Sequence, residues 1–93
     1  MNTTNVVVSI GNTDSRLTQA EFAKYVHECR SWITHYSEQV HFFGGSSTHE
    51  PWQNCAWIVE IQPDDVYGLL DELKTVREKY RQDSVFVMVG DGD

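Results

Sequence analysis

The chain has 93 residues, of which 40% are hydrophobic, and its formal net charge is −7. That length supports one core, so we expect residues 1–93 to form a single domain. The acidic charge excludes nucleic acid and anionic membranes as favoured partners, because both need a cationic surface. A basic protein partner or a cationic ligand fits the negative charge better, although such a charge more commonly serves only to keep a protein soluble.

Cysteine usage and the N-terminus both favour a cytoplasmic location. Cys29 and Cys55 fall at apolar positions in their predicted elements, as buried thiols do in a reducing compartment, and a single disulfide between them also fits. The first residues lack the basic segment and the apolar run of a signal peptide. No apolar run reaches the length of a transmembrane helix.

Hydrophobic periodicity predicts two helices and four strands. Thr18 and Glu21 have the spacing of a capping box, and the apolar residues that follow recur at every third or fourth position, so a helix begins here. Pro63 suits the first turn of a second helix. The predicted strands cover residues 5–10, 39–43, 54–61 and 84–89.

The element order βαββαβ predicts an α+β fold of the ferredoxin-like type. Right-handed crossovers then give a four-stranded antiparallel sheet in the order 4-1-3-2, with both helices on one face. In this topology three connections, residues 11–17, 44–54 and 81–83, meet at one end of the sheet. The candidate binding residues that they bring together are Asn12, Asp14, Trp52, Gln53, Asn54, Arg81, Gln82 and Asp83.

These polar residues have two interpretations. Amides beside large aromatic residues are either held in a hydrogen-bond network or directed at a partner. Internal satisfaction is the more common arrangement, so we favour Gln53 and Asn54 bonding neighbouring loop backbone. For the same reason we favour an internal ion pair of Arg81 with Asp14 or Asp83 over a contact with an anionic ligand.

The sheet face away from the helices is predicted to be apolar. The first and last strands carry apolar residues at successive positions, whereas a solvated sheet face is normally polar. A contiguous apolar patch is usually covered by another subunit or a partner. We therefore expect a homodimer or a protein partner on this face, and its candidate residues are Val7, Phe43, Ile58, Phe86 and Met88.

Catalytic and metal-binding patterns are weak. Asp14, in the turn after the first strand, resembles the catalytic Asp of small ferredoxin-like nucleases of the CRISPR-associated type, so a metal-dependent nuclease is a third hypothesis. An Asp in a turn before a helix more often bonds local backbone amides. The four histidines, His27, His35, His41 and His49, lack metal-ligand spacing. We predict no catalytic set, no metal and no cofactor.

The strings NVVVSIGNTDSRLTQAEF, PWQNCAW and YRQDSV resemble a group of small uncharacterised proteins encoded by actinobacterial phages. The likeness spans most of the chain outside residues 38–50. It implies the cytoplasm of an infected host cell as the setting, and it carries no known activity.

Two functions follow as hypotheses. The first is a small acidic non-enzymatic interaction protein, a phage product that binds and modulates a host protein. The alternative is a binder of a small nucleotide-like ligand at the polar end of the sheet. In that case Trp52 would stack on the ligand, and Gln53, Asn54 and Arg81 would bond to it.

Overall fold

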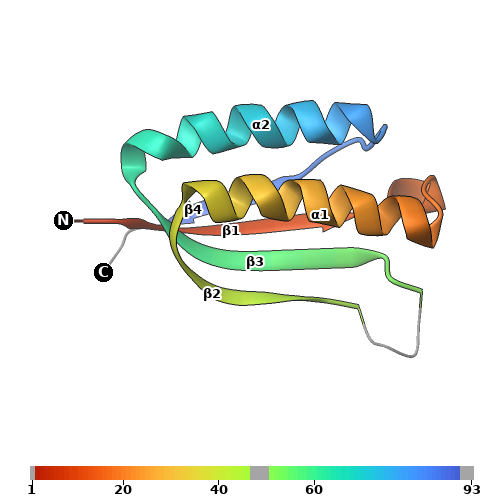
Figure 1. The fold of residues 1–93 in the computed structure, drawn as a ribbon, viewed down its shortest axis with the longest axis horizontal. Coiled ribbons are helices and arrows are strands. Elements are labelled where there is room, and N and C mark those ends of the chain that lie inside the picture. Colours follow the sequence, from red (N-terminus) through yellow and green to blue (C-terminus); the bar gives the residue numbers. More distant parts are fainter. Residues whose placement is uncertain (1, 47–50, 91–93) are drawn as a thin grey trace.

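A computed structural model describes residues 2–46 and 51–90 of the chain (Figure 1). All six predicted elements are present, and a short 3-10 turn precedes each helix. The second strand is longer at both ends than predicted, and the last strand starts two residues later. The elements are β1 (Thr4–Gly11), α1 (Gln19–Tyr36), β2 (Ser37–Gly45), β3 (Asn54–Ile61), α2 (Val66–Lys79) and β4 (Phe86–Gly90).

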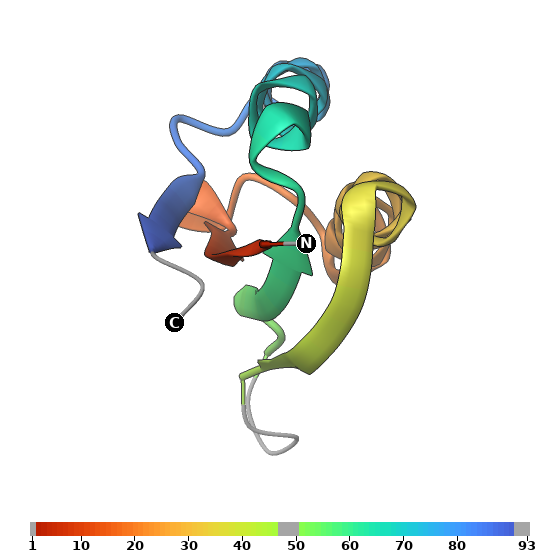
Figure 2. The ribbon, with the colours of Figure 1, turned by 90° about the vertical axis from the view of Figure 1, so that its left-hand side faces the viewer.

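The four strands form one antiparallel sheet in the order β2-β3-β1-β4, which is the predicted order read from the opposite edge. Both helices lie over the same face of this sheet (Figures 1 and 2). The pairing of β4 with β1 is regular from Ser9–Phe86 to Asn5–Gly90. By contrast, β2 shifts register twice against β3, between Ser37 and Gln39 and between Val40 and Phe42. The two edges of the sheet therefore differ in regularity.

Helix α1 begins with the predicted capping box. The Thr18 hydroxyl accepts a hydrogen bond from the Glu21 N–H at 3.1 Å, and the Glu21 carboxylate accepts one from the Thr18 N–H at 2.9 Å. Two N–H groups that lack helical partners are thereby satisfied. Hydrogen bonds from the backbone and side chain of Thr18 also lower the pKa of Glu21.

The core lies between the sheet and the two helices. Alternate residues of β1 and β3 are buried against the helices, as the predicted alternation of β3 requires. The largest fully buried side chain is Trp57 on β3, which is 1% exposed, followed by Tyr25 on α1. The Trp57 indole N–H and the Tyr25 hydroxyl are buried without a hydrogen-bond partner among the described residues. Both side chains therefore stabilise the core through packing.

Cys29 and Cys55 are both buried, and both are free thiols. Burial raises the pKa of Cys29 to about 12 and that of Cys55 to about 11. Because the thiolate is the reactive form, we expect both to react with an aromatic disulfide reagent at mildly alkaline pH far more slowly in native protein than in urea. Absorbance of the released thiolate measures both rates, and fast modification of either cysteine in native protein would contradict this expectation.

Candidate functional site

The three predicted connections lie at one end of the sheet, on the right in Figure 1, and hydrogen bonds join them. The Asn12 N–H donates to the Gln53 carbonyl at 3.0 Å, and the Gln53 amide donates to the Ser15 hydroxyl at 3.2 Å. On the other side, the Thr13 N–H donates to the side-chain oxygen of Gln82 at 2.7 Å. We call this region the three-loop end: residues 11–17, 44–46, 51–54 and 80–83.

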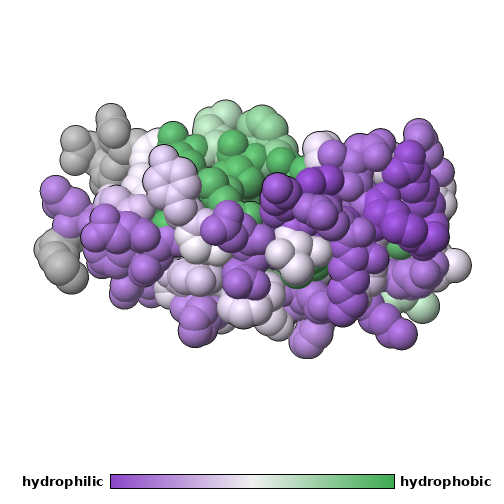
Figure 3. Space-filling view, turned by 90° about the horizontal axis from the view of Figure 1, so that it is seen from above, coloured by the Kyte–Doolittle hydropathy of each residue, from purple (hydrophilic) through white to green (hydrophobic). Residues whose placement is uncertain are grey.

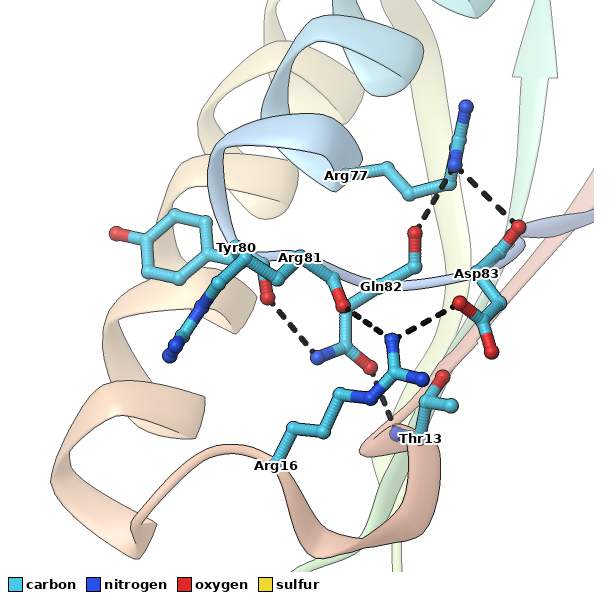
Figure 4. A network of polar contacts seen from close by, with 7 residues as sticks. All are labelled: Thr13, Arg16, Arg77, Tyr80, Arg81, Gln82 and Asp83. Atoms are coloured by element: carbon cyan, nitrogen blue, oxygen red, sulfur yellow. Dashed lines mark hydrogen bonds and ion pairs between the residues drawn. The ribbon is translucent and has the colours of Figure 1, made fainter.

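Gln82 links the α2–β4 connection to the β1–α1 connection (Figure 4). The residue is only 3% exposed. Its side-chain oxygen accepts from Thr13, and its side-chain nitrogen donates to the Tyr80 carbonyl at 3.0 Å. The Arg77 guanidinium donates to the Gln82 carbonyl at 2.9 Å. Both ends of the Gln82 amide are thus engaged inside the protein, and they are not free for a ligand.

Arg16, and not Arg81, pairs with Asp83. One Arg16 nitrogen lies 2.9 Å from the Asp83 carboxylate and also donates to the Arg81 carbonyl at 3.0 Å (Figure 4). Arg81 has a left-handed backbone, with φ of 58°, and its guanidinium lies 3.7 Å from Glu21. The predicted pairs of Arg81 with Asp14 or Asp83 are therefore wrong, because this turn directs the Arg81 side chain toward the start of α1.

Trp52 is fastened to helix α1. The Gln19 side chain exchanges two hydrogen bonds with the Trp52 backbone, donating to its carbonyl at 3.0 Å and accepting from its N–H at 2.7 Å. The indole packs edge-on against Phe22, with 5.4 Å between ring centroids. A Cβ on Gly45 would lie 2.7 Å from the indole nitrogen. Glycine at this position therefore lets β2 approach the Trp52 indole closely. The indole is half-buried and anchored, which disfavours stacking on a ligand.

Ser46 holds the two residues that follow Trp52. Its hydroxyl accepts hydrogen bonds from the N–H groups of Gln53 at 3.1 Å and Asn54 at 3.2 Å. Asn12 closes the neighbouring turn, because its side chain donates to the Leu17 carbonyl at 2.8 Å and accepts from the Leu17 N–H at 2.9 Å. The connections are thus held internally, but by the backbone N–H groups of Gln53 and Asn54 and not by their side-chain amides bonding loop backbone as predicted; the Gln53 amide instead donates to the Ser15 hydroxyl.

Asp14 lies in a tight turn on the surface. It has φ of 49°, and Ser15 beside it has φ of 53°. Within residues 2–46 and 51–90, no three His, Cys, Asp or Glu side chains are grouped as metal ligands. His49 lies outside the described residues. A nuclease of this type needs its carboxylate beside a metal ion. Among the described residues, no set of metal ligands surrounds Asp14.

A shallow groove of about 610 Å³ lies between α1 and the end of α2. Glu28 in this groove accepts hydrogen bonds from Lys79 at 2.9 Å and from the Tyr80 hydroxyl. Burial opposes ionisation of Glu28, but these two hydrogen bonds lower its pKa on balance. Glu28 is thus already paired with Lys79 and Tyr80, while Lys24 and His27 also line the groove.

The open sheet face carries the second candidate surface. Cross-strand pairs place Phe42 opposite Ile58, Ile58 opposite Val7, and Val7 opposite Met88. This arrangement makes one apolar row across all four strands, which we call the open-face row. Phe42, Ile58 and Met88 are 49%, 38% and 56% exposed. Three large apolar side chains therefore face solvent side by side.

The prediction that Phe43 belongs to this face is wrong. Its ring lies 5.4 Å from that of Trp57 and under the Arg30 guanidinium, which is 4.6 Å from the ring centroid, so Phe43 is on the helix side. The register shift between Val40 and Phe42 inserts one extra residue into β2 and reverses its alternation. Phe42 consequently takes the place predicted for Phe43.

Phe86 does lie on the open face. It pairs with Ser9 on β1 and lies two residues before Met88 along β4, on the same face of the sheet. Its side chain is 55% exposed. It therefore extends the apolar surface along β4 beyond the open-face row.

Three residues that tie the connections together were not among the predicted candidate residues: Arg16, Gln19 and Ser46. Arg16 had a usable signal, because it lies in one of the converging connections and has a charge opposite to that of Asp83. No comparable sequence signal marked Gln19 or Ser46. Their partners are backbone groups far away in sequence, so these contacts follow only from the folded register.

No protein-family model matches this chain, and comparison with curated proteins finds no similar sequence. In the described part of the chain, neither helix has both the length and the apolar character of a membrane span. The geometry of the two surfaces is therefore the basis for the function proposed below.

Proposed function

We propose that this chain is a small acidic, non-enzymatic interaction protein that binds another protein through the open-face row. The observation that carries the proposal is the continuous exposure of Phe42, Ile58 and Met88 across the sheet. Apolar rows of this kind are normally covered by a partner, since water solvates them poorly. The βαββαβ order and the strand order further support a ferredoxin-like fold.

Charge narrows the kind of partner. The chain has a net charge of −7, and none of the four strands contains Lys or Arg. On the open face, Glu60 lies beside the row, 3.6 Å from His41. A partner with an apolar patch and basic residues around it would complement this face. From the resemblance to phage proteins, we propose a host protein in the host-cell cytoplasm, whose activity the chain modulates.

The three-loop end gives less support to the nucleotide-like ligand. Gln82 is buried with both ends of its amide bonded, and Trp52 is anchored through Gln19 and Phe22. Binding a ligand there would break contacts that hold the connections together. Internal contacts account for most of these polar groups, the exception being the Gln53 side-chain oxygen, which is buried without a hydrogen-bond partner among the described residues. One such atom does not define a ligand site, so we do not propose a ligand.

Substitution on the two sides of the molecule tests the proposal. Wild-type protein, Ile58→Lys, Phe42→Lys and Tyr67→Lys are immobilised and exposed to host lysate, and any captured protein is purified for calorimetry. Tyr67 is a matched control, because it is an apolar residue 78% exposed on α2 and away from the open face. We expect wild type and Tyr67→Lys to bind equally, and both open-face variants to bind at least about tenfold more weakly, as for a lost central contact.

Circular dichroism first establishes that all four proteins are folded. A partner that binds all four with one affinity would place the binding site elsewhere. Failure of wild-type protein to bind any partner would contradict the proposed function.

A further inference from the structure

We propose that β4 pairs with β4 of a second copy of this chain, antiparallel about a two-fold axis. The two four-stranded sheets would then form one sheet of eight strands. This inference goes beyond the proposed function, because it uses the backbone edge of the sheet, whereas the proposed function uses the open face.

Within residues 2–46 and 51–90, no strand pairs with the outer edge of β4. β4 is the last strand in the sheet, and its one neighbouring strand in the described chain is β1 (Figure 2). Seen from the helix side, apolar side chains gather along this edge, at the top of the view in Figure 3. Val89 on the helix side, and Phe86 and Met88 on the open side, are each more than half exposed. An apolar edge strand with free backbone N–H and C=O groups is a template for another strand.

The opposite edge of the sheet is protected and β4 is not. β2 carries Glu38 and His41, and its two register shifts disrupt the regular edge that pairing needs. β4 instead pairs regularly with β1 at every position, and residues 84–90 contain no charged side chain, no proline and no bulge. Of the two edges, the β4 edge alone is therefore open to strand addition.

A second copy of β4 is the strand that fits. Val89 is exposed on the helix side of the sheet, while Phe86 and Met88 are exposed on the open side, so the added strand must be apolar on both of its faces. β4 itself has this property. An antiparallel pair centred on Val87 places Phe86 opposite Met88 and Val85 opposite Val89, which are apolar pairs throughout.

Charge and area limit the strength of this dimer. Two copies of a chain of charge −7 repel one another, although residues 84–90 themselves contain no charged side chain. A fully buried aromatic residue covers about 150–250 Å², so half-exposed Phe86 contributes roughly 100 Å². The total area that a few such side chains bury is smaller than the roughly 1,200 Å² of a stable interface. The dimer should accordingly be weak and concentration-dependent.

Sedimentation velocity and hydrogen exchange test the pairing on the intact chain. From low micromolar to several hundred micromolar, we expect a shift from monomer to dimer. Over the same range, exchange should slow for the outward amides of residues 85–90 and stay constant for residues 37–45. Slowed exchange reports backbone pairing, which association through the open face would not produce.

Two matched variants complete the test. Val89→Lys should remain monomeric, whereas Val40→Lys should dimerise as wild type does. Val40 lies on the other edge strand, is 44% exposed and also faces the helix side, since it pairs with buried Val59. A wild-type protein that is monomeric throughout would overturn the proposal, as would dimerisation of Val89→Lys or a dimer without added protection of β4.

The outcome is separable from that of the proposed function. Val89 lies on the helix side, so Val89→Lys leaves the open-face row intact and should still bind the proposed partner. Ile58→Lys, which should weaken binding of that partner, should still dimerise through β4.

Discussion

Replacing Gln82 with alanine is expected to lower the free energy of unfolding by about 2–4 kcal/mol. The Gln82 side chain is buried and bonds both the Thr13 N–H and the Tyr80 carbonyl. Alanine removes both contacts and leaves two part-buried backbone groups without partners, which costs more than the loss of an exposed hydrogen bond. Urea denaturation followed by tryptophan fluorescence measures the change.

Two further variants, one at the neighbouring Asp83 and one at Gln82, test how much of this effect depends on burial and how much on polarity. Asp83→Ala breaks the ion pair with Arg16, but that carboxylate side chain is 63% exposed, so we expect a loss of only about 0–1 kcal/mol. Gln82→Glu keeps an oxygen for Thr13 but buries a carboxylate and sets one of its oxygens against the Tyr80 carbonyl, so near neutral pH it should be at least as destabilising as Gln82→Ala. If Gln82→Ala cost no more than Asp83→Ala, Gln82 would not be the principal link between these connections.

Replacing Trp57 with alanine should destabilise the protein by about 3–5 kcal/mol. Trp57 is the largest fully buried side chain, and it packs against Phe43 at 5.4 Å between ring centroids. Alanine would leave a cavity between the centre of the sheet and the helices, and β3 cannot shift to fill it without disturbing its pairing with β1 and β2. Thermal or urea unfolding followed by circular dichroism measures the loss, because the substitution removes a fluorophore.

Trp57→Phe is the control that isolates ring volume. The indole N–H has no hydrogen-bond partner among the described residues, so its removal forfeits no polar contact. We expect Trp57→Phe to cost clearly less than Trp57→Ala. Equal losses would mean that the indole N–H has a stabilising partner and that packing is not the main contribution of Trp57.

Local sequence signals predicted the elements and their order well. The capping box of Thr18 and Glu21 marked the start of α1, and the alternation in 54–61 gave both the bounds and the buried face of β3. These signals succeed because they depend on neighbours in the chain, whose geometry is fixed within one turn or one strand. Once the order was known, topology alone brought the three connections together.

Other features could not be predicted because they depend on partners far away in sequence. The extra residue in β2 exchanged the faces of Phe42 and Phe43, and no turn residue announces that bulge. The left-handed backbone of Arg81 redirected its side chain to Glu21, although arginine rarely adopts this conformation. The residues that bind Trp52 and Gln53 likewise became identifiable only in the folded chain.

The bulge in β2 also bears on how this chain tolerates insertions and deletions. The two positions whose faces it exchanges, Phe42 and Phe43, carry the same residue type. A slip that paired Phe42 with Trp57 would put Phe43 on the open face opposite Ala56, and His41 would then take the place of Phe42 opposite Ile58. Removing His41 itself would instead abolish the bulge and leave Phe42 opposite Ile58 and Phe43 opposite Trp57, so this edge of the sheet should tolerate the loss of that one residue without altering the core or the open face.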